Sequence, residues 1–292
     1  MKQDTVGLLL NYRDAPRSIR CVQSLLDEGV SRVFVWDNSA DEGRGAAAIR
    51  HAFAADPRVG VYASEVNLGF AAGVNRALAL CAQRDPRSRV LLINNDARLL
   101  PGGLSRLAEG LDRDARACLA FPDIHHAGRT LGAAYAHRLT GLLSWRHKAG
   151  KAGWFEYASG CCMLLSLERL DLPLFDEDFF MYGEDCELGW RLSRRPGALI
   201  HIHETLVEHE GSMSSGLGSP FYENALVAAH LLLARKLARS SRERGLLLVC
   251  RSAMLLMRAL VRSIRFRSLT PLKALWHGWQ AVRATLQVKN AR

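Results

Sequence analysis

Short apolar runs alternate with helix-like stretches through the first hundred residues, and most of these runs end in polar residues. The runs cover Val6–Asn11, Arg32–Trp36, Val59–Ala63 and Val90–Ile93. Continuous apolar runs of this length are typical of strands buried on both faces of a sheet. Strands that alternate with helices predict a parallel, doubly wound α/β sheet, in which ligands bind at the carboxyl ends of the strands.

Apolar spacing also predicts the remaining elements, and the pattern is less regular after residue 97. We expect helices over Arg17–Glu28, Gly45–Ala54, Ala71–Ala82 and Leu104–Leu111, and strands over Cys118–Pro122 and Cys161–Leu165. From Pro220 onward the chain is predicted to be helical, with breaks near Arg244–Gly245 and at Pro271.

Positive charge is concentrated near the C-terminus. The net charge is +10, yet residues 231–292 hold 14 Lys or Arg against one acid, Glu243. A basic segment on a mildly acidic body predicts that this segment alone binds an anionic surface. It does not favour nucleic-acid binding by the whole protein. The 7 cysteines form no CxxC pair, and no run is long enough for a signal peptide or a membrane span. We therefore expect a reducing, cytoplasmic location.

Polar residues at the ends of the first two strands are candidate nucleotide contacts. Asp37 ends the second strand and precedes Asn38 and Ser39, and Asn11 ends the first strand. A carboxylate at Asp37 can accept the imide N–H of a uracil or thymine ring, while the next two side chains face a ribose. Asp-Asn-Ser is also common in plain turns, so this segment alone leaves both interpretations open.

The stretch Asn67–Asn75 begins a helix and contains Gly69 and Gly73. Glycines permit close backbone approach, and the free N–H groups of a helix N-terminus attract phosphate. The spacing matches neither GxGxxG nor GxxxxGK[ST], which disfavours a dinucleotide cofactor and an NTPase. The alternative is a helix start that contains glycine for structural reasons alone.

Asn94-Asn95-Asp96 follows the strand Val90–Ile93. A carboxylate at a strand end can hold Mg²⁺ or Mn²⁺ against a diphosphate, because these cations prefer oxygen ligands and share them with phosphate. His209 can add a metal or phosphate ligand. The spacing of the nearby histidines is not HExxH, which disfavours a zinc protease. His201 and His203 are expected to be ordinary strand histidines.

Residues 175–191 form the most informative stretch, with six carboxylates among five aromatic residues. Aromatic faces suit the apolar faces of sugar rings, so Tyr182 and Trp190 are candidate acceptor contacts. Glu184 and Asp185 can supply one general base and one carboxyl group that orients it or binds acceptor hydroxyls. A solvated acidic loop, the alternative, does not need so many large aromatic residues.

Six segments follow one another in a fixed order. They are DNS at Asp37–Ser39, NLGFAAGVNRAL at Asn67–Leu78, INNDA at Ile93–Ala97, ASGCCMLL at Ala158–Leu165, FFMYGEDCELGWRL at Phe179–Leu192 and HEGS at His209–Ser212. In this order they resemble glycosyltransferase family 2, and most closely its rhamnosyltransferase-like branch. The resemblance covers roughly residues 4–240, and the combined order is far more specific than any one segment.

The resemblance implies a fold and a reaction. The implied fold is GT-A, a Rossmann-like, mostly parallel sheet, which we expect over residues 1–215 with a helical extension over 216–292. The implied reaction is inverting and metal-dependent. It transfers a sugar from a nucleotide donor, often dTDP-L-rhamnose, to a bacterial surface glycan of the lipopolysaccharide type. Mg²⁺ or Mn²⁺ is the implied cofactor, and a lipid-linked glycan is the implied acceptor.

The resemblance also implies roles for single residues. Asp185 is the implied catalytic base with Glu184 beside it, and Asp96 with His209 would hold the metal. We expect acceptor contacts from Tyr182, Glu184 and Trp190. Taken with the residues discussed above, the expected donor contacts are Asn11, Asp37, Asn38, Asn67, Gly69, Asn75 and Asn95.

Two positions depart from the family pattern. Asn94-Asn95-Asp96 keeps only the last carboxylate of the DxD-like motif. Tyr222-Glu223-Asn224 stands where the family often has an Arg-Asn pair, so a phosphate contact from that arginine is not expected.

Three other functions are weighed against this one. A nucleotidyltransferase that makes sugar nucleotides shares the sheet, but Tyr12–Pro16 lacks the glycines that such enzymes place after the first strand. A non-catalytic nucleotide or glycan binder at a membrane does not need Asp96, Glu184 and Asp185. Nucleic-acid binding needs stacking aromatic residues on the basic face, and only two tryptophans of the C-terminal segment qualify.

The C-terminal segment contains a basic amphipathic pattern. Arg244, Arg251, Arg258, Arg262 and Arg265 share one arc of a helix, opposite Leu246, Val249, Leu256, Met257, Leu260 and Ile264. With Trp276 and Trp279 beyond it, the pattern is typical of a helix on an anionic membrane surface. We therefore expect peripheral attachment to the cytoplasmic face of the inner membrane. The alternative is a helix packed on the catalytic domain with its arginines in solvent.

Overall fold

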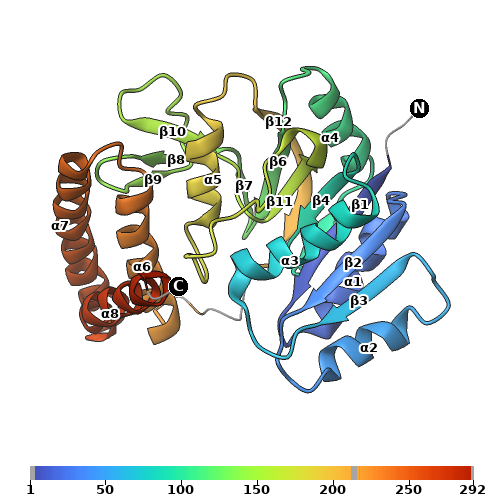
Figure 1. Cartoon of the computed structure of the whole chain (residues 1–292), viewed down its shortest axis with the longest axis horizontal. Coiled ribbons are helices and arrows are strands. Elements are labelled where there is room, and N and C mark those ends of the chain that lie inside the picture. Colours follow the sequence, from blue (N-terminus) through green and yellow to red (C-terminus); the bar gives the residue numbers. More distant parts are fainter. Residues whose placement is uncertain (1–3, 212–215, 217, 291–292) are drawn as a thin grey trace.

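A nine-stranded sheet forms the centre of the molecule, for which the computed structural model describes residues 4–211, 216 and 218–290 (Figure 1). Its strands are β1 (Thr5–Asn11), β2 (Arg32–Asp37), β3 (Val59–Ala63), β4 (Arg89–Ile93), β5 (Ala97–Leu99), β6 (Leu119–His126), β7 (Arg129–Leu131), β11 (Cys162–Ser166) and β12 (Leu199–His209). The order is β3-β2-β1-β4-β11-β6-β12-β5, with β7 beside β6. The first four strands are parallel, as are β6 and β12, whereas β11 is antiparallel to both of its neighbours.

Helices cover both faces of this sheet because both faces of its central strands are apolar. The helices are α1 (Ala15–Asp27), α2 (Arg44–Ala52), α3 (Gly69–Arg84), α4 (Gly103–Asp112) and α5 (Glu184–Leu192). α1, α2 and α4 bury Val22, Ile49 and Leu107 on one face. α3 and α5 bury Leu78 and Leu188 on the other face. The doubly wound α/β arrangement predicted from the sequence is confirmed.

A second, smaller sheet was not predicted. Its order is β10-β8-β9, from β8 (Ala134–His137), β9 (Leu143–Ser144) and β10 (Trp154–Tyr157). These strands are 4, 2 and 4 residues long, too short for an alternating pattern to identify them.

Three helices follow the sheet and pack beside the small sheet and α5 (Figure 1). They are α6 (Pro220–Lys236), α7 (Ser241–Phe266) and α8 (Thr270–Asn290). The break predicted near Arg244–Gly245 is wrong, because α7 runs through it from a cap at Ser240. A single glycine is tolerated inside a helix that packs well elsewhere. Within the described residues, none of the helices combines the length and the apolar character that a membrane span requires.

The middle of the arginine face of α7 packs inward. Arg251 is 1% exposed, and its Nη2 donates to the carbonyl oxygen of Arg138 at 2.8 Å. Arg258 and Arg262 form ion pairs with Glu223 of α6, which is also 1% exposed. The apolar residues of the opposite arc are exposed instead, at Leu246, Val249, Leu256, Met257, Leu260 and Ile264. These three arginines join α7 to the rest of the protein. The prediction that they form part of a basic membrane-facing arc is therefore wrong, and so is the alternative of a solvated face.

Candidate active site

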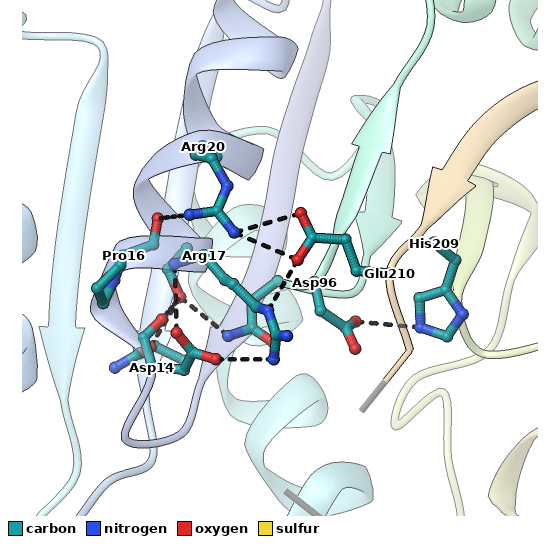
Figure 2. Close-up of polar contacts among 10 residues, drawn as sticks. Asp14, Pro16, Arg17, Arg20, Asp96, His209 and Glu210 are labelled. Atoms are coloured by element: carbon teal, nitrogen blue, oxygen red, sulfur yellow. Dashed lines mark hydrogen bonds and ion pairs between the residues drawn. The ribbon is translucent and has the colours of Figure 1, made fainter. Parts of the chain in front are cut away.

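Asp96 and His209 meet at the carboxyl edge of the sheet. Nε2 of His209 lies 3.1 Å from Oδ1 of Asp96 (Figure 2). The neighbouring ring of His126 donates from Nδ1 to the carbonyl oxygen of His209 at 3.1 Å, which fixes the end of β12. Carboxylate oxygen is the ligand type that Mg²⁺ and Mn²⁺ prefer, and imidazole is a common ligand of transition metals. The pair can therefore hold a divalent cation and leave positions for phosphate oxygens.

A separate set of possible metal ligands lies on β6 and β12. Within the described residues, the ligand atoms of Asp123, His201 and His203 all lie within 4.8 Å of one another. Nε2 of His201 is 2.7 Å from Oδ1 of Asp123, and the His201 ring stacks on Phe121 with 4.8 Å between centroids. The two histidines are strand residues, as expected. Their grouping with Asp123 was not predicted, because the aspartate lies on another strand.

Asp37 is held rigidly at the end of β2 and is only 1% exposed. Its Oδ1 accepts hydrogen bonds from the Asn11 amide at 2.9 Å, from the Ser39 N–H at 3.1 Å and from the Ser39 hydroxyl. Asn11 is fully buried and accepts a further bond from the Ser18 hydroxyl at 2.7 Å. Asn11 therefore orients Asp37.

Asn38 joins the end of β2 to the start of α3. Its Nδ2 donates to the Gly69 carbonyl oxygen at 2.9 Å and to Oδ1 of Asn67 at 3.0 Å. Its Oδ1 accepts from the N–H of Leu68 at 3.0 Å. The structure thus brings Asn38, Asn67 and Gly69 together beside Asp37.

Gly69 also touches the acidic aromatic stretch. Its φ is +79°, and a Cβ atom at this position would lie 2.3 Å from the carbonyl oxygen of Phe180. The N–H of Phe70 donates to that same oxygen at 2.7 Å. Only glycine fits here without displacing the backbone. One N–H group at the start of α3 is therefore occupied by protein, although the sequence suggested phosphate for this helix start.

Glu184 and Asp185 form the first turn of α5, after a tight backbone turn. Tyr182 has φ +67° and Gly183 has φ +94°. A tyrosine in this conformation is strained, and such strain is common at functional sites. The Tyr182 ring packs edge-on against Tyr222 of α6, with 5.5 Å between centroids.

The two carboxyl groups have different environments. Asp185 accepts hydrogen bonds from the N–H of Cys186 at 2.7 Å and from the N–H of Gly160 at 3.2 Å. Glu184 is 6% exposed, and no described residue forms a hydrogen bond with its Oε2. Burial and the neighbouring charge of Asp185 raise the pKa of Glu184 to about 8. Burial also raises the pKa of Asp185, but backbone N–H groups oppose this rise. The two backbone N–H groups therefore favour the negative charge on Asp185 over a charge on Glu184.

The segment before β11 links the two carboxylate sites. Gly160 donates to Asp185, and the carbonyl oxygen of the next residue, Cys161, accepts from the N–H of Asn94 at 2.8 Å. Asn94 lies two residues before Asp96. Asp96 and Asp185 thus stand on adjoining segments at one edge of the sheet.

Two expected donor contacts have protein partners. Asn75 donates to the carbonyl oxygen of Phe175 at 2.8 Å and accepts from its N–H at 3.0 Å. Asn75 therefore fastens the acidic aromatic stretch to α3. Nδ2 of Asn95 donates to the Ser18 hydroxyl at 3.1 Å, which joins the segment after β4 to α1.

Trp190 lies apart from the cluster. It is six residues beyond Glu184 on α5, about 9 Å along the helix axis. Its ring packs edge-on against Phe155 at 5.3 Å and lies 4.8 Å from the guanidinium carbon of Arg138. This packing explains the placement of Trp190, and its position does not support a contact with the acceptor.

Sequence reasoning missed two arginines at the same edge. Arg17 and Arg20 of α1 both form ion pairs with Glu210, which follows His209 (Figure 2). The N–H of Glu210 donates to the Asp96 carbonyl oxygen at 3.0 Å. Because 193 residues separate Arg17 from Glu210, no local pattern indicates the contact.

A cavity of about 260 Å³ opens elsewhere, among Asp4, Ser31, Arg84 and Ser88. Asp4, Ser31 and Ser88 directly precede β1, β2 and β4, so the cavity lies at the amino edge of the sheet. None of the expected site residues lines it.

The doubly wound sheet has carboxylates at its carboxyl edge and a carboxylate pair at the start of α5, an arrangement that is compatible with a glycosyltransferase. Residues 10–168, more than half of the chain, match the family model described as "Glycosyl transferase family 2". The chain belongs to glycosyl transferase family 2. It is also similar to the N-acetylglucosaminyl-diphospho-decaprenol L-rhamnosyltransferase of Mycobacterium tuberculosis (strain CDC 1551 / Oshkosh), with 24% identity over 221 residues. That match covers 66% of this chain and 71% of the relative.

Solved structures confirm the GT-A fold. The mannosyltransferase PcManGT from Pyrobaculum calidifontis, in complex with GDP-Man and Mn²⁺, has a TM-score of 0.55 at 14% identity. That match covers 100% of this chain and 88% of PcManGT. GalNAc-T7 with UDP, GalNAc and Mn²⁺ has a TM-score of 0.56 at 14% identity over 90% of this chain. The chain spans 57% of the length of GalNAc-T7.

Proposed function

We propose that this chain transfers L-rhamnose from dTDP-L-rhamnose to a hydroxyl group of a lipid-linked bacterial surface glycan, with inversion at the anomeric carbon. The observation that carries this proposal is the hydrogen-bonded segment that joins Asp185 to the neighbourhood of Asp96. One carboxylate suits a cation beside a diphosphate, and the other suits the proton of an attacking alcohol. The name of the mycobacterial relative supports this sugar and this class of acceptor.

The proposed reaction is one displacement. The acceptor oxygen bonds to the anomeric carbon while the bond from that carbon to the diphosphate oxygen breaks, and the nucleoside diphosphate leaves. Asp185 takes the proton of the acceptor hydroxyl, and a base in this role contributes about 10²- to 10⁴-fold in rate. Glu184, protonated at neutral pH, is suited to donate a hydrogen bond to the acceptor.

Asp96 and His209 are the proposed ligands of Mg²⁺ or Mn²⁺. The carboxylate and the imidazole fit such an ion because they stand 3.1 Å apart at the edge where a phosphate would lie. When bound, the cation supplies positive charge that stabilises the departing diphosphate. Structures of this fold that are named with Mn²⁺ support the choice of cofactor.

Asp37 is the proposed contact of the thymine or uracil ring. All hydrogen bonds of its side chain with described residues are made by Oδ1. Oδ2 accepts none from the described part of the chain, and the backbone of Gly45 passes beside it. That oxygen is suited to the imide N–H of the base, while Asn38 and Ser39 flank the ribose.

We further propose that residues 1–215 carry out the transfer and that residues 216–292 attach the enzyme to the cytoplasmic face of the membrane. The attaching surface is the α7 stripe, which we define as Leu246, Val249, Leu256, Met257, Leu260 and Ile264. Its side chains are 48–80% exposed. Exposed Arg242 and Arg244 precede the stripe, and exposed Arg265 and Arg267 follow it. An apolar stripe with basic ends fits the headgroup boundary of an anionic bilayer.

Purified protein incubated with dTDP-L-rhamnose, Mn²⁺ and a synthetic polyprenyl-diphosphate-linked N-acetylglucosamine tests the transfer. We expect one rhamnose on the lipid, inverted stereochemistry by NMR, and release of dTDP. UDP- and GDP-sugars serve as matched donors. Transfer from one of those alone would contradict the rhamnose assignment, and failure to bind any nucleotide sugar would contradict the transferase itself.

A further inference from the structure

Two arginines of α1 reach the edge that holds Asp96 (Figure 2). Nε of Arg17 donates to Oε2 of Glu210 at 2.9 Å, and its Nη1 donates to Oδ2 of Asp14 at 3.1 Å. Nη2 of Arg20 donates to both Glu210 oxygens, at 3.2 and 3.3 Å. Because the N–H of Glu210 donates to the carbonyl oxygen of Asp96, one residue separates these guanidinium groups from the proposed cation site.

The helix start itself is already satisfied by protein. Oδ1 of Asp14 caps α1 by accepting from the N–H of Arg17 at 3.3 Å, and a proline occupies the first turn. Anion binding by the free N–H groups of this helix is therefore disfavoured. The positive charge available at this edge is that of the side chains.

The two arginines differ in how firmly they are placed. The Arg17 side chain is 22% exposed and is anchored by two different carboxylates. The Arg20 side chain is 57% exposed, and apart from Glu210 its bond is a 3.5 Å contact with the Pro16 carbonyl oxygen. Arg17 is thus the pre-oriented group of the two, since Asp14 would still hold it if Glu210 moved away.

Glu210 is a replaceable partner. Its side chain is 52% exposed, and ion pairs with an exposed carboxylate contribute little to stability. A phosphate oxyanion offers the Arg17 guanidinium more negative charge and more acceptor atoms.

We infer that Arg17 binds the diphosphate of the sugar donor and exchanges the carboxylate of Glu210 for phosphate oxygens when the donor arrives. This inference rests on the proposed function. Arg17 would act on the side of the diphosphate that faces α1, while Asp96 and His209 act through the cation. A fixed positive charge at this position stabilises the leaving group as its negative charge grows. Asp14 keeps the guanidinium in place through the exchange.

Binding of dTDP and dTMP in Mn²⁺, measured by isothermal titration calorimetry, tests the inference. A hydrogen bond to a charged group corresponds to about a 10- to 100-fold change in affinity. We expect Arg17→Ala to weaken the binding of dTDP by about that factor and the binding of dTMP clearly less. Arg17→Lys keeps the positive charge without the planar guanidinium group. Its affinity for dTDP should lie between that of Arg17→Ala and that of the wild type. Glu210→Gln removes the competing carboxylate and should bind dTDP at least as tightly as the wild type.

Arg20→Ala is the matched control, because Arg20 shares Glu210 but lacks the Asp14 anchor. It should leave the dTDP affinity within about threefold of the wild type. Unchanged dTDP binding in Arg17→Ala, or equal losses of dTDP and dTMP, would overturn the inference while leaving the proposed function intact. A wild type that binds neither nucleotide would overturn both, so the two failures are distinguishable. Thermal unfolding without ligand confirms that each variant is folded.

Discussion

Nε2 of His209 lies 3.1 Å from Oδ1 of Asp96, although 113 residues separate the two along the chain. The contact forms because β12 ends beside β5, where His209 pairs with Ala97, the residue after Asp96. Two side chains that can hold a metal are thus placed by one strand pairing.

This contact predicts how metal dependence responds to mutation. Asp96→Asn and His209→Ala should each lower the Mn²⁺-dependent affinity for dTDP by about 10- to 100-fold, because each removes one proposed ligand. Calorimetry in Mn²⁺ and in EDTA measures the difference. His203→Ala is the control, since it disturbs only the separate Asp123 group. If His203→Ala loses the Mn²⁺ dependence while His209→Ala keeps it, the cation binds at the Asp123 group instead.

The Gly69 turn predicts a steric effect. Gly69→Ala should lower the free energy of unfolding by more than the roughly 1–2 kcal/mol that a left-handed alanine costs, because its Cβ would meet the Phe180 carbonyl oxygen at 2.3 Å. Gly102→Ala is the matched control, since Gly102 has φ +78° with nothing within 4 Å of its Cβ. Urea denaturation measures both variants. Equal losses would show that the Phe180 contact contributes nothing.

The pKa of Glu184 predicts a pH dependence of stability. Burial and Asp185 raise this pKa to about 8, whereas an unfolded glutamate titrates near about 4.3. The folded state therefore binds more protons between these values, and the free energy of unfolding falls as pH rises through that range. Glu184→Gln should remove up to about 1.4 kcal/mol of this fall per pH unit.

Urea denaturation from about pH 5 to about pH 8, in the wild type and Glu184→Gln, measures the difference. The comparison isolates the Glu184–Asp185 pair, because buried groups outside this pair act alike in both proteins. His230, whose pKa burial lowers to about 3, is one of these groups. Identical pH slopes in the two proteins would show that Glu184 is ionised when folded.

The α7 stripe predicts membrane binding through apolar side chains. Met257→Asp with Ile264→Asp should reduce cosedimentation with vesicles that contain phosphatidylglycerol, because these side chains are 53% and 80% exposed on the stripe. Leu172→Asp, at a 41% exposed leucine outside α7, is the control and should bind vesicles like the wild type. If the double variant still sediments with vesicles but light scattering gives it a smaller particle size than the wild type, a second copy of the chain covers the stripe instead.

The sequence predicts the parallel strands of the first hundred residues well, and it singles out Glu184 and Asp185 as candidate site residues, because both features carry local signals. Apolar runs mark the strands, and Glu184 with Asp185 stands inside a dense aromatic segment. Contacts that depend on tertiary packing carry no such signal. The Arg17–Glu210 pair spans 193 residues.

The orientation of α7 shows the same limit. Helical periodicity separates its arginines from its apolar residues, but it does not say which side faces the protein. Buried Glu223 decides that question, because it draws Arg258 and Arg262 inward. The expected role of Trp190 also depended on packing. Phe155 packs edge-on against its ring, and the guanidinium group of Arg138 lies over that ring.

Asp185→Asn tests the central claim most directly. Gly160 and Cys186 donate to different oxygens of Asp185, so the amide oxygen of the variant keeps one of these two hydrogen bonds while the base is lost. Transfer from dTDP-L-rhamnose should fall by at least about 100-fold, with dTDP affinity in Mn²⁺ unchanged within about twofold. Near-normal transfer by a variant that binds dTDP as tightly as the wild type would contradict the assignment of Asp185 as the base.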